Sequence, residues 1–347
     1  MSSREFSTNL SILIILMGSL GDVVRGLYLV PHIKRNMPDS KISWLIEPKW
    51  AELVDLHPQV DHVIIFNRPK GARAVWDLYR DLAEEHFHIT LDLQRHFKSG
   101  FFSLLSRGKR RVGFHRRDAK EFNWIFNNET ISYFGDELPK LHHYLKFTEY
   151  LGLPPPDCLE SGFSSLDLKA KTPRSVAELD APFIAVVMGS SWDSKDWLFE
   201  GYYQLVKHVL ASRREKIVLL GDRSKSSLAA LLTEKVASPS LINLVGKTSL
   251  LEVAAVLRAA SAGVGPDSGP AHLAPAMGTP YVTIFGPTSP ARVSPFGCEH
   301  LAVQSEVECA PCYKKQCPGL DRLCMRQITA GTVEEKLSQA LAMGTAN

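Results

Sequence analysis

The sequence has no apolar run approaching the roughly 18 residues that a membrane-spanning helix requires. An apolar stretch, residues 10–17, lies close to the N-terminus, but its core is short and Gly18 and Asp22 follow at once. No small-x-small cleavage site precedes the next charged residues, so we expect a buried first strand here rather than a signal peptide. The formal net charge is only +3, which gives no case for a nucleic-acid-binding protein.

Cysteine is also sparse outside one short segment. Of the six cysteines, four are crowded together: Cys309, Cys312, Cys317 and Cys324. One crowded corner in a thiol-poor chain is not the pattern of a secreted disulfide scaffold, so a cytoplasmic protein is expected. Cys309 and Cys312 have the spacing of a metal-ligand pair, but the later spacings are irregular. A structural metal site and free or opportunistically paired thiols both remain open.

The chain is too long, at 347 residues, for one comfortable core, so two domains are expected. An apolar content of 45% and a charged content of 22% are typical of a soluble globular protein. The regular pattern breaks down between residues 153 and 181, which contain Pro154-Pro155-Pro156. We therefore predict an N-terminal domain over residues 1–165, a linker over 166–181 and a C-terminal domain over 182–347.

Both predicted domains alternate short apolar runs with amphipathic stretches, which indicates parallel βαβ units covered by helices on both faces. In the first domain we expect strands at 11–16, 41–46, 60–66 and 89–93, and helices at 23–34, 50–56 and 72–85. In the second we expect strands at 183–188, 216–220, 241–244, 263–265 and 281–285, and helices at 202–211, 228–236 and 250–259. The predicted fold class is α/β, with two Rossmann-like, doubly wound parallel sheets facing a central cleft.

The turn after the first strand lacks the G-x-G-x-x-G spacing of a dinucleotide site, because its glycines stand at 18, 21 and 26. It ends instead in Asp22, at the start of a helix. A helix N-terminus keeps a carboxylate ionised, which suits a base that acts as an anion. A plain N-cap would look the same in the sequence, so both roles stay open.

Two turns of the second domain are suited to anions. In residues 188–197, Ser190 and Ser191 supply hydroxyl donors and Lys195 a positive charge beside a glycine. In residues 264–280, Asp267 or Ser268 can cap a helix that Gly269 opens, and free N–H groups at a helix start bind phosphate. An ordinary capped helix is the alternative for that turn, but two anion-competent loops in one domain favour a diphosphate site.

Basic residues gather in the first domain. Arg95, His96 and Lys98 follow the fourth predicted strand and are candidates for an anionic acceptor. The run 107–117, which contains seven Arg, Lys or His side chains, could meet an anionic substrate or membrane surface, or be a solvated loop.

Taken in order, these turns resemble those of the bacterial lipopolysaccharide heptosyltransferases, glycosyltransferase family 9. The matching pieces are residues 18–23, Asp92-x-Gln94 with Lys98-Ser99, residues 189–197, residues 267–274 and Phe285-Gly286-Pro287-Thr288. They run from residue 11 to about 330, and the cysteine segment with Cys324-Met325 resembles the second-heptose branch of the family.

The resemblance implies a GT-B fold and an inverting transfer of heptose from ADP-heptose to the inner core of lipid A-linked saccharide. It implies Asp22 as the base and a donor site made of Ser190, Ser191, Lys195, Asp222, Asp267, Ser268, Gly269 and His272. Arg95, His96 and Lys98 would bind the acceptor. No cofactor beyond the donor substrate is implied, and the expected location is cytoplasmic, peripheral to the inner membrane. Two features depart from the family pattern: Arg25 beside the base, and Asp222 where a glutamate is expected for the ribose. The alternatives are a sugar-nucleotide epimerase of the same architecture, a transferase for another nucleotide sugar, and a non-catalytic nucleotide-binding module.

Overall fold

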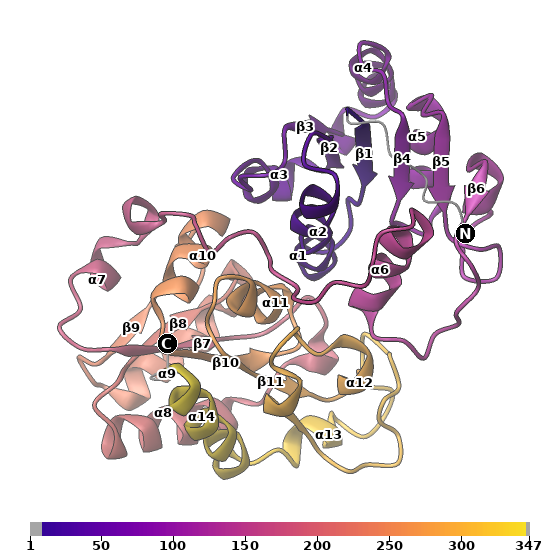
Figure 1. Ribbon diagram of the computed structural model, residues 1–347. Helices are drawn as coiled ribbons and strands as arrows, with labels where there is room; N and C mark the ends of the chain where they lie inside the picture. The colour runs from indigo at the N-terminus through magenta and orange to yellow at the C-terminus, as the bar shows by residue number, and fades with distance from the viewer. Residues whose placement is uncertain (1–8, 345–347) are drawn as a thin grey trace. The chain divides into compact units, whose positions relative to one another are not determined.

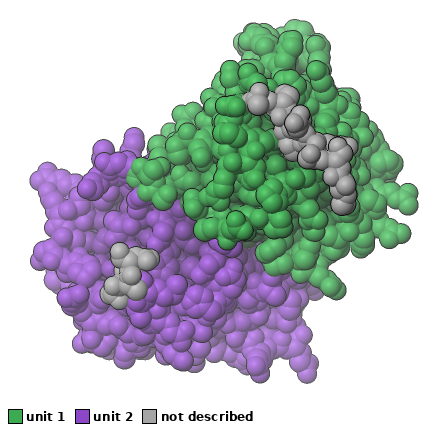
Figure 2. Space-filling view, in the orientation of Figure 1, with its two compact units in different colours: residues 1–166 green, residues 167–347 purple. Residues whose placement is uncertain are grey.

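The computed structural model describes residues 9–344, and these divide into two compact units, residues 1–166 and 167–347 (Figure 2). Each unit is built around its own parallel sheet, labelled in Figure 1.

The first unit contains six strands and six α-helices within the described residues. In chain order they are β1 (Ser11–Ile15), α1 (Leu20–Leu27), α2 (Leu29–Asn36), β2 (Lys41–Ile46), α3 (Pro48–Asp55), β3 (His62–Ile65), α4 (Ala72–Ala83), β4 (Ile89–Asp92), α5 (Phe97–Leu105), β5 (Arg110–Gly113), β6 (Glu129–Thr130) and α6 (Lys140–Tyr150). Short 3₁₀ turns lie at η1 (Arg68–Lys70) and η2 (Asn123–Phe126).

The strand order of this sheet is β3-β2-β1-β4-β5-β6, and all neighbours are parallel. The direction in which the chain adds strands reverses between β1 and β4. In open α/β sheets, ligands bind outside the carboxyl ends of the strands at such a switch point. The turns after β1 and β4 are therefore the expected place for a site in this unit.

Helices cover both faces of the first sheet. Leu13, Ile15 and Met17 pack into one cluster with residues of α4 and α5. Leu16 points to the other face, where a Cβ at Gly26 of α1 would lie 2.5 Å from its side chain. This alternation is the period of two of a strand buried on both sides, which is why β1 reads as a continuous apolar run.

The second unit follows the same plan. Its strands are β7 (Phe183–Val187), β8 (Lys216–Leu220), β9 (Leu241–Asn243), β10 (Ala262–Pro266), β11 (Tyr281–Phe285) and β12 (Ala302–Gln304). Its helices are α7 (Arg174–Ala177), α8 (Phe199–Ser212), α9 (Ser226–Val236), α10 (Leu250–Ala259), α11 (Gly269–Ala276), α12 (Pro290–Val293), α13 (Leu323–Arg326) and α14 (Ala330–Gly344), with 3₁₀ turns η3 (Lys169–Lys171), η4 (Asp193–Lys195), η5 (Arg223–Lys225) and η6 (Glu299–Leu301).

The second sheet has the order β12-β11-β10-β7-β8-β9, again parallel throughout. Counted from its own first strand, this is the same topology as the first sheet, with the switch point between β7 and β10. Helices α8 and α14 pack together over one large buried cluster, and α10 packs on α11 (Figure 1). The turns after β7 and β10 are the expected ligand-binding turns of this unit.

The structure differs from the sequence-based prediction, or adds to it, in several places. The helix predicted over 23–34 is two helices, α1 and α2, because Pro31 has no N–H to donate to the carbonyl of Leu27. Residues 97–150 contain α5, β5, β6 and α6, and residues 302–304 form β12; neither was predicted as regular structure. The basic run 107–117 was left open between an anion-binding surface and a solvated loop; within it, Arg110 and Arg111 begin strand β5. Residues 169–177, inside the predicted linker, form η3 and α7.

Candidate functional site

All four turns singled out by the sequence lie at the switch points of the two sheets. Ser19 to Asp22 follow β1 and residues 93–98 follow β4 in the first unit. Residues 188–195 follow β7 and residues 267–272 follow β10 in the second. Each sheet thus carries its polar residues at the edge where doubly wound folds bind ligands. We describe the two groups separately.

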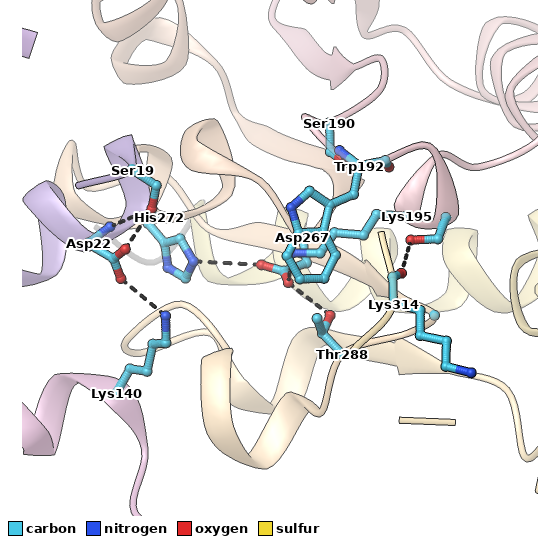
Figure 3. A network of polar contacts seen from close by, with 12 residues as sticks. Ser19, Asp22, Lys140, Ser190, Trp192, Lys195, Asp267, His272, Thr288 and Lys314 are labelled. Carbon is cyan, nitrogen blue, oxygen red and sulfur yellow. Dashed lines mark hydrogen bonds and ion pairs between the residues drawn. The ribbon is translucent and has the colours of Figure 1, made fainter. Parts of the chain in front are cut away.

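Asp22 lies in the first turn of α1 and is surrounded by cations (Figure 3). Its Oδ1 lies 3.1 Å from Arg25 Nη1 and 3.3 Å from Lys140 Nζ, which comes from α6. Its Oδ2 accepts a 2.8 Å hydrogen bond from the hydroxyl of Ser19. The N-cap of α1 is Ser19, whose side chain also accepts from the Asp22 N–H, so Asp22 does not act as the cap itself. Its carboxylate faces side-chain cations instead.

These partners decide the protonation state of Asp22. Burial alone would raise the pKa of its carboxyl, but Lys140, Arg25 and the Ser19 hydroxyl together hold the pKa well below its usual range. Tyr144, one turn after Lys140, is buried, and its own pKa is raised by burial and by the negative charge of Asp22. The carboxyl of Asp22 is therefore an anion at any ordinary pH, in a partly buried and positively charged environment.

The three predicted acceptor residues are held in different ways. Arg95 is largely buried: its guanidinium lies over the ring of Phe114 at 4.6 Å and 2.9 Å from His143 Nδ1. His96 is half-exposed and lies 3.2 Å from a carboxylate oxygen of Glu121. Lys98 donates to Glu47 at 2.8 Å. Each has a protein partner, so each would bind an anionic acceptor in competition with it.

A buried carboxyl ties these turns together. Asp92 ends β4 and is fully buried, and its oxygens accept from the N–H of Gln94 and, at 2.6 Å, from the side-chain amide of Asn123. Gln94 in turn accepts from the N–H of Met17, at the end of β1. Burial raises the pKa of Asp92 to about 7, although these hydrogen bonds pull it down. Asp92 therefore positions the turn that precedes Asp22.

In the second unit the central group is Asp267, which follows β10 and is buried (Figure 3). Its Oδ2 accepts from Lys195 Nζ at 2.7 Å and from the Thr288 hydroxyl at 2.8 Å, and Oδ1 lies 3.8 Å from His272 Nε2. Burial alone would raise the pKa of Asp267, but His272 and Lys195 hold it well below its usual range. An anion cannot itself bind a phosphate, so Asp267 is placed to orient Lys195, Thr288 and His272.

A second lysine–aspartate pair lies beside the first loop. Asp196 accepts from the backbone N–H of Ser190 at 2.7 Å and forms an ion pair with Lys225. Lys225 crosses directly over Gly189: that glycine has φ +77°, and a Cβ there would lie 2.3 Å from the lysine side chain. Only glycine allows this approach. The loop therefore has two cations close to its backbone, Lys195 and Lys225.

The remaining predicted donor residues differ in exposure and in their hydrogen bonds. Ser191 is exposed and Ser190 half-buried, with its hydroxyl bonded to the backbone of Trp192. Ser268 is the N-cap of α11, yet its side chain makes no capping bond, and within the described residues its buried Oγ has no hydrogen-bond partner. Gly269 begins the same helix. Asp222 is exposed and caps η5 through the N–H of Ser224.

The four clustered cysteines line one cavity of about 90 Å³. All are free thiols, and three backbone N–H groups, those of residues 319, 322 and 320, lower the pKa of Cys317. Across residues 9–344, no three His, Cys, Asp or Glu side chains are grouped so that they could hold a metal ion. The segment of residues 309–324, which holds the four cysteines, packs on the loop that carries Lys195, since the Ser194 hydroxyl donates to the carbonyl of Lys314 at 2.6 Å (Figure 3).

Sequence reasoning missed several members of these groups. Lys140 lies more than a hundred residues from Asp22 and begins a helix that was not predicted. Thr288, Asp196 and Lys225 stood in or beside the quoted motifs but were assigned no role. The sequence around a hydroxyl or a lysine does not show which carboxylate it contacts. The pairs of Lys140 with Asp22, Thr288 with Asp267 and Lys225 with Asp196 are therefore visible only in the folded structure.

The comparisons with known proteins point to one family. The model of glycosyltransferase family 9 (heptosyltransferase) matches residues 75–321. The chain is 26% identical over 291 residues to the lipopolysaccharide core heptosyltransferase OpsX of Haemophilus influenzae, and the aligned residues cover 82% of each chain. It is 27% identical over 322 residues to lipopolysaccharide heptosyltransferase 1 of Pseudomonas aeruginosa, covering 88% of this chain and 87% of that protein.

Among solved structures, that of the Escherichia coli heptosyltransferase WaaC with ADP superposes with a TM-score of 0.78 at 21% identity, covering 95% of this chain and all of that one. The fold is thus that of two Rossmann-like domains, and the prediction of a GT-B fold is confirmed. The chain belongs to glycosyltransferase family 9, the heptosyltransferase family.

Proposed function

We propose that the protein transfers a heptose from ADP-heptose to the inner core of lipopolysaccharide, with inversion at the anomeric carbon. The observation that carries the proposal is an ionised carboxylate, Asp22, at the switch point of one sheet, and a cationic, hydroxyl-rich pair of turns at the switch point of the other. The names of the relatives, lipopolysaccharide heptosyltransferases, support the choice of donor and acceptor. Membership of a glycosyltransferase family favours transfer over epimerisation.

In the proposed reaction an acceptor hydroxyl oxygen attacks the anomeric carbon of the donor, the bond from that carbon to the phosphate oxygen breaks, and ADP leaves. Asp22 takes the hydroxyl proton. Because Lys140 and Arg25 keep its pKa low, Asp22 is a weak base. It accepts the proton late, when the forming bond to carbon has made the hydroxyl strongly acidic.

The leaving diphosphate gains negative charge as the bond breaks. Lys195 is the group we assign to offset that charge, with hydroxyl donors from Ser190, Ser191 and Ser268 and backbone N–H groups at Gly269. Asp267 would keep Lys195 and His272 in position, and Asp222 would bind the ribose.

The reaction as proposed needs no divalent metal, because the two carboxylates beside these turns, Asp196 and Asp267, each already accept from a lysine. A chelator should therefore leave turnover unchanged.

We assign the acceptor to the first unit, at Arg95, His96 and Lys98. The acceptor is lipid-anchored in this proposal, so the protein would work at the cytoplasmic face of the inner membrane. None of the helices within residues 9–344 is both long and apolar enough to cross a membrane. Docking on an anionic surface would instead use exposed cations. Arg110 and Arg111 are unsuited, since Arg110 forms a bidentate pair with Glu129 and Arg111 donates to backbone carbonyls.

The experiment that tests the donor assignment compares ADP-heptose with other nucleotide sugars. Purified protein should show its largest rise in melting temperature with ADP-heptose, and it should release ADP from it only when a core acceptor is added. Release of an epimerised nucleotide sugar without acceptor would support an epimerase, and binding without turnover would support a non-catalytic module.

A further inference from the structure

A short segment of the first unit exposes large apolar side chains that are not free to turn inward. Between β5 and β6 the chain leaves the sheet, and here Phe122 is 71% exposed, Ile125 53% and Trp124 40%. Phe97, at the start of α5, is 49% exposed and lies against Phe126 with ring centroids 4.9 Å apart. We call these four exposed residues, Phe97, Phe122, Trp124 and Ile125, the apolar ridge.

The ridge is anchored by buried polar groups. Asn123 lies within it but is fully buried, and its amide donates to Asp92 at 2.6 Å and to the carbonyl of His96 at 2.9 Å. A Cβ at Gly100 of α5 would lie 2.8 Å from the carbonyl oxygen of Asn123, so the segment packs directly on that helix. With Asn123 pinned inside, the side chains on either side of it are held outward.

The backbone of the segment is strained in a way that favours this exposure. Glu121 and Phe122 have φ of 50° and 58°, the left-handed region that residues other than glycine rarely adopt. Glu121 is fixed there because its carboxylate accepts from the N–H of Phe97 and meets His96. Strained backbone that the surroundings hold in place is typical of functional segments. Here this backbone conformation goes with a Phe122 side chain that is exposed to solvent.

Exposed cations lie in the same segment of chain as the ridge. Arg116, Arg117 and Lys120 belong to the same excursion between β5 and β6, and all three are exposed. Of the carboxylates of this stretch, Asp118 is buried, and Glu121, bonded at the start of α5, interacts with the charge of Lys120. Arg116 and Arg117 leave the stretch with an excess of positive charge. Exposed aromatic and aliphatic side chains in one segment with exposed arginine and lysine form the pattern of a surface that enters the head-group layer of an anionic bilayer.

The ridge also lies beside the proposed acceptor residues. His96 and Phe97 are adjacent in the chain, and the N–H of Lys120 donates to the carbonyl of Arg95 at 2.7 Å. If the ridge inserts into the membrane surface, Arg95, His96 and Lys98 lie close to that surface, where the saccharide of a lipid-anchored acceptor would be.

We propose that the apolar ridge, with Arg116, Arg117 and Lys120, is the surface by which this protein docks on an anionic lipid bilayer. The proposal deepens the proposed function, because it rests on the acceptor being lipid-anchored. It commits to a bilayer rather than a protein partner, since exposed cations accompany the apolar side chains in the same connection between β5 and β6.

The test uses the full-length protein and vesicles of phosphatidylglycerol and phosphatidylcholine in a 3:7 ratio. Phe122→Ser/Ile125→Ser should weaken cosedimentation by about tenfold or more, because each lost side chain removes buried apolar area. Arg116→Gln/Arg117→Gln/Lys120→Gln should weaken it by about fivefold for each charge removed at low salt, and less at high salt. Leu231→Ser, which alters a 41% exposed leucine on α9 of the second unit, is the matched control and should bind as the wild type does.

Trp124 supplies a second readout at the ridge itself. The chain has six tryptophans, so the emission of the wild type minus that of Trp124→Phe isolates this residue. That difference spectrum should shift to the blue when vesicles are added and be quenched by brominated lipid.

Activity on a water-soluble core fragment separates this proposal from the proposed function. The double-serine variant should transfer heptose to that fragment at the wild-type rate while losing activity on vesicle-borne acceptor. If neither form transfers heptose, the proposed function fails, but the vesicle results still decide the docking surface. Wild-type protein that ignores anionic vesicles, or serine variants that bind them normally, would overturn the proposal. A dimer in sedimentation that the double-serine variant dissolves would assign the ridge to a second copy and would overturn it as well.

Discussion

Lys140 Nζ lies 3.3 Å from Asp22 Oδ1, and it reaches that carboxylate from a helix that begins 118 residues later in the chain. Together with Arg25 it holds the pKa of Asp22 well below the usual range of an aspartate, against the opposing effect of burial. The proposed base is thus always charged but intrinsically weak. Lys140 is a positioning residue, and its charge sets how weak a base Asp22 is.

Replacing Lys140 by methionine should raise the pKa of Asp22, because one of the two cations that lower it is gone. A single close charge of this kind is worth about 1 unit or more. The acid limb that Asp22 gives to the kcat/KM profile lies at low pH in the wild type, and it should move to higher pH by about that amount, while the affinity for ADP stays unchanged. Lys146→Met, on the same helix but paired with Glu149, is the matched control and should leave the profile in place. An acid limb that stays at the wild-type position in Lys140→Met would show that Asp22 is not the titrating base.

Lys195 should affect both ADP binding and stability. In Lys195→Met the diphosphate loses a charge-assisted contact worth about 1.5–3 kcal/mol, so ADP measured by calorimetry should bind at least tenfold more weakly. The same change leaves Asp267 buried without its nearest cation, which should destabilise the fold by about 3 kcal/mol.

The double variant Lys195→Met/Asp267→Asn separates the two effects. It removes both charges, so it should regain most of the melting temperature but none of the ADP affinity. Lys207→Met, a lysine of α8 that lies over the ring of Tyr203, is a control for loss of a surface lysine. ADP binding at wild-type strength in the double variant would remove Lys195 from the phosphate site.

Asp92 should make stability depend on pH near neutrality. Its pKa is about 7 in the folded chain and close to the ordinary value of 3.8 when unfolded, so folding favours the protonated form. Its contribution to stability is fully present below about pH 4 and is lost as the pH rises through 7. Three units correspond to a few kcal/mol, on the order of 1.4 for each unit. The melting temperature should therefore fall between pH 5 and 8 by more in the wild type than in Asp92→Asn, which cannot ionise. Parallel curves for the two proteins would contradict the raised pKa.

Much of the fold could be predicted from the sequence, because a strand that is buried on both faces consists of a continuous run of apolar residues. Residues 183–187 and 281–285 are such runs, and both strands lie where expected. The edge strands β6 and β12 were missed because they are only two and three residues long. Strand β5 was missed because it begins with Arg110 and Arg111, whose charged groups are bound by Glu129 and by the backbone carbonyls of Gly108 and Phe126, partners that the sequence does not mark.

The site was predictable only in part, for a similar reason. Turns after buried strands place Asp22, Lys195 and Asp267 at the carboxyl edges of their sheets, and that much follows from topology. What each side chain does there depends on a partner from another element. Asp267 was expected beside phosphate, whereas its contacts with Lys195, Thr288 and His272 suit it to hold other groups in place. Its role in donor binding stays a prediction.

The most direct test of the account is the transfer reaction itself. Purified wild-type protein, ADP-heptose and a core acceptor that lacks the heptose are incubated, and the product is examined by mass spectrometry and by the anomeric proton coupling in NMR. The account predicts one added heptose with inverted configuration and one ADP released for each transfer. It also predicts that Asp22→Asn lowers kcat by roughly 10²–10⁴ with ADP affinity unchanged, the usual span for loss of a general base. No transfer by the wild type, retention of configuration, or more than a tenth of wild-type turnover in Asp22→Asn would contradict it.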